Sequence, residues 1–418
     1  MKKLIFLIAF IALALIPIAQ EIQHEAIAVN IEVPVRVYKG DNFVDDLTID
    51  DFVVYEDGVI QEVLAVYLIK KTDIQRKEEM PAPKEEEKQT FKPDTSRSFY
   101  LFFEVVEYTP KLNKAIEYFF QNVLMPSDNL TIVTPMNTYR LKSEFFSNVS
   151  TEETINQIRK ILRKDAWMGS SEYRRLNNEL KRLVRILGGS KDRSERPAFL
   201  SSGKGRMTIS SGGTEDDPVV NLAMYEEILI RLESIRKVDQ KRLLDFAQHL
   251  KDQTGQKYVF LFYQREYIPQ LENWEYFKKL NSLDVATKMK LIALMGYYFR
   301  DIGFDIDRIK QAYADSSISI NFLFFTKPAK YIPGVKMVEH SEDIFSVFRE
   351  MAQATGGITT SSANPKYLFQ RASDAVESYY LLYYSPKNYK ADGKFKKITV
   401  KVKGQNYRVT HRAGYIAD

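Results

Sequence analysis

Two glutamates, Glu104 and Glu107, stand where an apolar stretch, Phe99–Val106, runs into the start of a helix near Tyr108. If that stretch is a strand of an open α/β sheet, both lie at its carboxyl end, where such sheets bind ligands. Carboxylates there could hold a residual divalent cation, which prefers oxygen ligands, or contact a partner. The alternative is that they are solvated carboxylates at a helix N-terminus, where the helix dipole favours negative charge.

Two other stretches have residue types that could bind ions. The acidic run Glu215, Asp216 and Asp217 precedes Pro218; it is a charged first turn of a helix or, alternatively, a cation site. The glycine-rich run 203–206 reads G-K-G-R. It lacks the residue order of a phosphate-binding P-loop and does not directly follow a strand, so we predict a flexible loop.

The sequence shows no set of residues for nucleophilic catalysis. The chain has no cysteine and no G-x-S-x-G motif, and no two of its histidines pair at metal-ligand spacing. The histidines are His24, His249, His340 and His411. We therefore predict a protein that is not an enzyme and that needs no cofactor.

The first 19 residues have the pattern of a signal peptide. Lys2 and Lys3 precede an apolar run, and Ala19 stands at a cleavage position. The alternative is an uncleaved N-terminal anchor. We expect an exported protein, periplasmic or extracellular, with no membrane span after cleavage. The net charge of +5, about +3 without the two lysines, does not favour nucleic acid as a partner.

The chain divides into β-rich ends and a mixed middle. Residues 26–70 alternate apolar and polar side chains, with an Asp-Gly hairpin signal at 57–58. Residues 72–97 are charged, contain prolines and offer little to bury, which predicts a flexible linker. Residues 379–416 again read as strands.

Strands and helices alternate over residues 98–378, with a helical insertion at 165–250. Such alternation predicts an α/β fold with a doubly wound, mostly parallel sheet. Small sheets must bury one face, so we expect residues 26–70 and 379–416 to pack together as one β-sandwich. The valines 33, 35 and 37 would face Ile398, Val400 and Val402.

Three blocks together resemble the bacterial, acidobacterial-type VWFA-related domain proteins. The first is L-T-I-D-D-F-V-V-Y-E-D-G-V-I-Q-E-V, from Leu47. The second ends at Thr355-Gly356-Gly357. The third runs from S-Y-Y-L-L-Y-Y-S-P through D-G-K-F-K-K-I-T-V-K-V-K to Arg412-Ala413-Gly414-Tyr415. The resemblance covers residues 26–416 and implies secretion and a von Willebrand factor A-type domain, but no defined activity.

The resemblance also implies a metal-ion-dependent adhesion site, D-x-S-x-S, after the first strand of that domain. Those positions carry Glu104, Val106 and Tyr108, and the threonine of the site falls on Thr214. Two of the three first-loop ligands are therefore missing, and we predict a degenerate site without metal. Glu104, Glu107 and Tyr108 remain as candidate partner-binding residues.

These observations predict a non-catalytic interaction protein of the adhesion or scaffold type. Its expected partner is another protein or a cell-envelope polymer. One alternative is a metal-dependent adhesion domain, against which the missing ligands argue. The other is a periplasmic enzyme with an unrecognised active site, against which the absent catalytic motifs argue.

Overall fold

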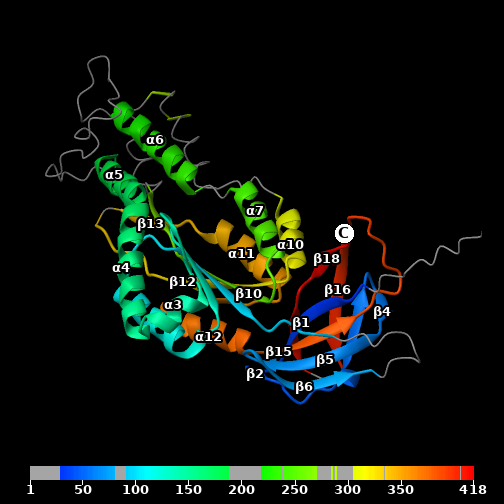
Figure 1. Cartoon of the computed structure of the whole chain (residues 1–418). Helices are drawn as coiled ribbons and strands as arrows, with labels where there is room; N and C mark the ends of the chain where they lie inside the picture. The colour runs from blue at the N-terminus through cyan, green and yellow to red at the C-terminus, as the bar shows by residue number, and fades with distance from the viewer. Residues whose placement is uncertain are drawn as a thin grey trace, which may run out of the picture.

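The computed structural model shows a mixed α/β fold (Figure 1). Helices flank a central sheet, and two further sheets are built from strands of both ends of the chain. The structure describes residues 29–80, 91–187, 218–236, 239–270, 284–285, 288–289, 305–333, 335–404 and 406–418. The predicted signal peptide, Thr214, the acidic run 215–217 and the G-K-G-R loop lie outside these residues.

The central sheet has the strand order β14-β12-β10-β7-β8-β9. Its two innermost strands are β10 (Gln256–Gln264), buried along its whole length, and β7 (Arg97–Glu104). These two run parallel to each other and to their other neighbours, and only β9 is antiparallel. The remaining strands are β12 (Ile318–Phe325), β14 (Thr359–Ser362), β8 (Asn129–Val133) and β9 (Thr138–Leu141).

Helices cover both faces of the central sheet. One face packs against α2 (Pro110–Tyr118), η2 (Phe119–Val123), α4 (Thr151–Gly169) and α12 (Pro365–Glu377), in a core centred on Phe99, Phe119 and Phe260. The other face packs against α7 (Gln240–Lys251), α10 (Ile306–Asp315) and α11 (Glu342–Ala354). The short helix α3 (Ser143–Asn148) follows β9.

Two antiparallel sheets combine strands from both ends of the chain, drawn blue and orange to red in Figure 1. The larger has the order β17-β1-β15-β5-β6, in which β1 pairs with β15, Val33 opposite Leu382. The smaller has the order β18-β16-β3-β4. The strands are β1 (Ile31–Lys39), β2 (Asn42–Phe43), β3 (Phe52–Glu56), β4 (Val59–Gln61), β5 (Val63–Lys70), β6 (Asp73–Glu79), β15 (Ser378–Tyr384), β16 (Phe395–Val402), β17 (Arg408–His411) and β18 (Gly414–Ile416), with the 3-10 turn η1 (Ile49–Asp51) before β3.

The two end sheets share one apolar core. Valines 33, 35 and 37 of β1 and Ile398 and Val400 of β16 are all buried in it, with Val402 packed against its margin. Tyr384 of β15 and Tyr415 of β18 both donate to Glu56 Oε2, at 2.7 and 3.0 Å. The bonds join strands that are more than 300 residues apart in the sequence.

A third body projects at the upper left of Figure 1. It consists of α5 (Ser171–Leu187), α6 (Pro218–Arg236) and the two-stranded sheet of β11 (Tyr267–Gln270) and β13 (Lys336–Glu339), which share an apolar cluster of their own. The residues expected as a helical insertion, 165–250, thus contain the end of α4 as well as α5, α6 and α7.

The sequence-based fold class, a von Willebrand factor A-type, mostly parallel α/β fold, is wrong. Ten of the fourteen described strand pairings are antiparallel, and parallel pairing is confined to one sheet. The alternation of strands and helices predicted parallel pairing correctly only for the middle strands. The strands of the two ends pair with one another as antiparallel neighbours, and they dominate the count.

The linker prediction for residues 72–97 also needs correction. Asp73–Glu79 form β6, the edge strand beside β5. Its charged composition is compatible with a strand because an edge strand pairs with a neighbour on one side only. Charges on its open side discourage pairing with other chains. Residues 81–90 lie outside the described part of the chain.

Candidate functional site

The loop after β7, at the carboxyl edge of the central sheet, is held by hydrogen bonds to the neighbouring strand. The backbone amides of Val106 and Glu107 both donate to Oε1 of Gln264, each at 3.0 Å. Gln264 is the last residue of β10 and is buried. Its single amide oxygen thus satisfies both donors that a ligand would otherwise meet at this position.

The same loop is joined to the helices on its other side. The carbonyl of Val106 accepts from Ser170 Oγ at 2.7 Å and from Arg174 Nη1 at 3.4 Å. Tyr108, which the sequence resemblance had placed at a metal-ligand position, is half-buried; its ring packs on the core and its hydroxyl donates to Asn113 Oδ1. Two of the sequence-predicted positions therefore serve the packing of the loop.

The two carboxylates differ in their surroundings. Glu104 has a solvent-accessible side chain, but nearby protein desolvates it, and this effect, together with the negative charge of Glu266, raises the pKa of Glu104. Glu107 is exposed and forms an ion pair with Lys327. Glu104 therefore faces another carboxylate, whereas Glu107 faces a lysine.

Among the described residues, no group of three or more histidine, cysteine or acidic side chains is placed to hold a metal ion. The described part of the chain also contains no helix long and apolar enough to cross a membrane. Thr214 lies outside the described residues, so its position relative to Glu104 is not part of this geometry.

Sequence reasoning missed a group of exposed apolar side chains beside this loop. Trp167 is 68% exposed, Met136 45% and Met168 41%. A Cβ on Gly169 would lie 2.6 Å from Pro135 Cβ and 3.5 Å from Met136 Cγ, so the end of α4 abuts the turn between β8 and β9. We call Met136, Trp167 and Met168, with Glu107 and Lys327, the carboxyl-edge surface.

Arg174 links the parts of this surface. Its guanidinium carbon lies 5.4 Å from the centre of the Trp167 ring, and it donates to the carbonyls of Trp167 and Val106. The sequence could have indicated this surface through a tryptophan on the polar face of an amphipathic helix. Which face of α4 is exposed follows only from how the helix packs on the sheet.

Positive charge gathers next to the carboxyl-edge surface. Desolvation, followed by the charges of Lys330, Arg185 and Lys327, lowers the pKa of Lys181 on α5. Because like charges lower a lysine pKa only at short range, Lys330, Arg185 and Lys327 lie near Lys181, on the side where Lys327 meets Glu107.

Comparison with known proteins leaves the family open. No family model and no curated protein matches this chain. A solved structure, the human COPII-coat protein Sec24c, aligns over 78% of this chain and 44% of its own, with 10% identity and a TM-score of 0.24. This chain thus spans less than half of Sec24c, and a similarity this weak gives no support to a von Willebrand factor A-type assignment.

The opposite, amino edge of the central sheet holds two of the blocks that carried the sequence resemblance. Thr355 forms an isolated bridge with Arg412, and the Ala413 amide donates to the Ala354 carbonyl at 2.7 Å. A Cβ on Gly357 would lie 1.9 Å from the Ile320 carbonyl oxygen. Gly357 therefore lets the chain after α11 approach β12, and the bonds of Thr355 and Ala354 to residues 412 and 413 dock the end sheets against the central sheet.

Gly356 has the same role. Its φ is +69°, and a Cβ there would lie 2.7 Å from the His411 carbonyl carbon. His411 is itself structural, because its Nε2 accepts from the Val400 amide at 3.2 Å and burial lowers its pKa. We call Arg36, Thr355, Gly356, Gly357 and Arg412 the amino-edge junction.

Proposed function

We propose that this protein is an exported, non-catalytic interaction protein that binds another protein or a cell-envelope polymer through the carboxyl-edge surface. The observation that carries the proposal is the exposure of Trp167 and Met168 near the end of α4 and of Met136 in the turn that this end abuts. Tryptophan, methionine and arginine are enriched at protein interfaces, and tryptophan and arginine dominate binding energy there. The loop beneath them is fixed by hydrogen bonds, so little ordering would be needed on binding.

Charge supports a partner with an acidic surface. Lys330, Arg185 and Lys327 lie close enough to Lys181 for their positive charges to disfavour its own. An approaching carboxylate or phosphate group would relieve that repulsion and would steer association at low salt. Export remains an inference from the apolar segment that precedes the described residues.

Site-specific photo-crosslinking in cells that produce the protein tests the proposal. A benzophenone amino acid at Met168 should give one discrete crosslinked product. The same group at Ile60, which is 55% exposed on β4 in an end sheet, should not. The product from position 168 should fade as salt rises, because exposed charges are screened. Identical products from both positions, or none from position 168, would reject the proposal.

A further inference from the structure

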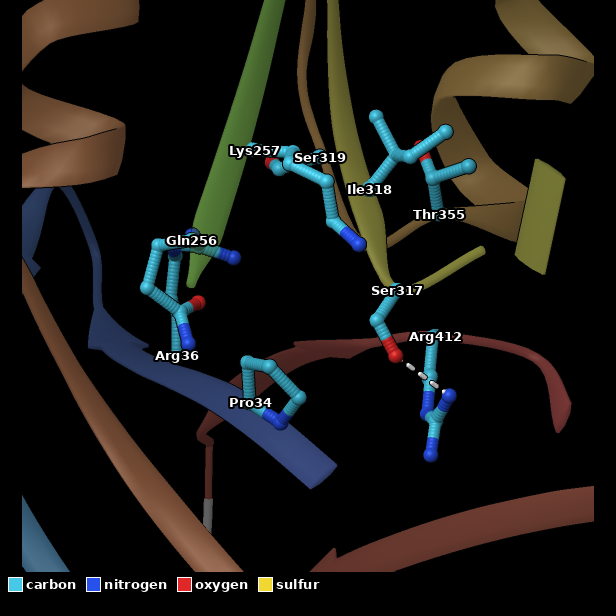
Figure 2. Close-up of a pocket in the computed structure, with 9 residues that line it drawn as sticks. All are labelled: Pro34, Arg36, Gln256, Lys257, Ser317, Ile318, Ser319, Thr355 and Arg412. Atoms are coloured by element: carbon cyan, nitrogen blue, oxygen red, sulfur yellow. Dashed lines mark hydrogen bonds between the residues drawn. The ribbon is translucent and has the colours of Figure 1, made fainter. Parts of the chain in front are cut away.

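Three basic side chains are buried together at the amino edge, around a small cavity between the end sheets and the central sheet (Figure 2). Arg36 is 3% exposed, Lys257 5% and Arg412 7%. Arg36 comes from β1, Lys257 from β10, and Arg412 directly follows β17. Burying a charge is costly unless an opposite charge or strong hydrogen bonds compensate it.

No carboxylate compensates these cations directly. None of the three lies within ion-pair distance of a carboxylate, judged over the described chain. The nearest acidic side chain, Glu32, accepts from Tyr383 at 3.1 Å and from Gln256 at 3.4 Å, and burial raises its pKa. Asp315, further out, is paired with Lys251. The Lys257 amine donates to the carbonyls of Leu250 and Gln253 at the end of α7, at 2.9 and 2.8 Å, which offsets part of its charge. Even with Glu32 ionised, the cluster keeps a net positive charge.

Hydrogen bonding leaves free donors in the same place. The Nε atoms of Arg36 and Arg412 and Oγ of Ser319 are buried and have no hydrogen-bond partner among the residues that the structure describes. Arg36 has one long bond, from Nη1 to the Gly356 carbonyl at 3.4 Å. Arg412 is better held, with bonds of 2.6 Å to Ser317 Oγ and to the Glu32 carbonyl. All three residues with free donors line the cavity.

The cavity is small. It offers about 10 Å³ to the centre of a water-sized sphere, which is room for about one such sphere. Figure 2 shows the Ser317 hydroxyl turned toward the Arg412 guanidinium, which donates to it, with Pro34, Gln256 and Lys257 around the same space. A phosphate, a sulfate or an organic carboxylate is too large for it, whereas a halide ion is closer in size to a water molecule.

We propose that this cavity binds one small monovalent anion, with chloride as the natural occupant. A water molecule would satisfy the free donors but would leave the positive charges uncompensated. A halide accepts several hydrogen bonds and also supplies negative charge in a low-dielectric setting, where charge interactions are strong. Because the ligands come from β1, β10 and the segment after β17, the bound anion holds the end sheets on the central sheet.

Unfolding of the full-length protein in urea tests this. Sodium gluconate is replaced by sodium chloride at constant ionic strength and pH 7. An anion that binds only the folded state lowers the unfolding constant by the factor 1 + [L]/Kd, about elevenfold at about 150 mM chloride for a Kd of about 15 mM. The effect should saturate, and bromide should reproduce it. Equal stability in chloride and gluconate would overturn the proposal.

Two variants and one direct observation complete the test. Lys257→Met should lose the chloride dependence, while Lys397→Met, which removes an exposed positive charge on β16, should keep it. If Lys257→Met does not fold, anomalous scattering from bromide-soaked crystals of the unaltered protein decides. A bromide peak between Arg36, Lys257 and Arg412 supports the site. Water density there without anomalous signal, or bromide seen only at crystal concentrations with no effect on stability, overturns it.

Discussion

The two edges of the central sheet use polar residues in opposite ways. At the amino edge, four charged side chains are buried and hydrogen-bonded within the protein: Arg97 to Asp128, Lys257 to the Leu250 carbonyl and Arg412 to Ser317. At the carboxyl edge, Glu104 and Glu107 are exposed, and Trp167 stands in solvent. The difference teaches that the amino edge holds the chain ends in place, whereas the carboxyl edge is fixed in shape but open to contact.

This contrast changes the meaning of the sequence motifs. Thr355-Gly356-Gly357 and Arg412-Ala413-Gly414-Tyr415 carried the family resemblance, and both lie at the amino edge, where close backbone packing requires them. Gly414 is packed equally closely within the smaller end sheet, where a Cβ would lie 2.1 Å from the Lys396 carbonyl oxygen of β16. The most recognisable residues of the chain are therefore architectural.

Breaking the ion pair at the amino edge should have the largest effect on stability. Arg97 donates to both carboxylate oxygens of Asp128, at 3.0 and 2.6 Å, and both side chains are 1% exposed. Asp128→Ala leaves a buried guanidinium without its partner, so we expect a loss of about 3–5 kcal/mol in the free energy of unfolding. Urea denaturation measures this loss. A loss below about 1 kcal/mol would contradict the claim that buried polar residues at the amino edge hold the structure together.

Gly357→Ala should have the next largest effect. The added methyl group meets the Ile320 carbonyl oxygen, and the backbone must move apart. Overpacking of this kind costs about 1–3 kcal/mol. Gly40→Ala is the matched control for crowding, since nothing lies within 4 Å of a Cβ there, although its φ of +62° adds backbone strain. Equal midpoints for Gly357→Ala and the unaltered protein would show that the chain after α11 is not closely packed against β12.

A smaller effect is expected from pH. Burial, with the charge of Arg412 second, lowers the pKa of Lys257 to about 8, below the unfolded value near 10.4. Between those values the unfolded chain binds more protons at this site, so the contribution of Lys257 to stability rises with pH. From pH 8 to 10 the unaltered protein should gain stability relative to Lys257→Met. A difference that stays flat over this range would mean that Lys257 is not desolvated.

Substitution at the carboxyl edge should change the stability least. The exposed ion pair of Glu107 and Lys327 should contribute no more than about 1 kcal/mol, as surface pairs do. Glu107→Ala should therefore leave the urea midpoint almost unchanged. The slope of the unfolding free energy against urea concentration should also stay the same. If it cost as much as Asp128→Ala, the loop after β7 would be part of the folding core and the contrast between the edges would fail.

Part of this arrangement could be predicted from local sequence. The apolar run expected as a strand at Phe99–Val106 is observed as β7, two residues earlier, because continuous apolar residues favour a strand buried on both faces. The charged residues 73–79 were expected in a linker and form β6, since edge strands tolerate charge. Local composition does not distinguish those two cases.

The rest required three-dimensional placement. The contact between Gly356 and His411 joins residues far apart in the chain, and no spacing rule predicts it. The same holds for the cations from β1, β10 and the residue after β17, which look like ordinary surface charges in the sequence. Trp167 and Met168 lie at the end of an amphipathic helix, and their exposure follows only from where α4 packs.

The most direct test of the account is crosslinking across the carboxyl-edge surface. A benzophenone amino acid at Met136 reports on binding, and Trp167→Ala removes the most exposed apolar side chain of the carboxyl-edge surface. Because Trp167 is 68% exposed, its loss should change stability by no more than about 0.5 kcal/mol. As an interface anchor it should contribute about 2 kcal/mol or more to binding. We predict an unchanged urea midpoint and a crosslink yield reduced about tenfold or more; an unchanged yield would contradict the account.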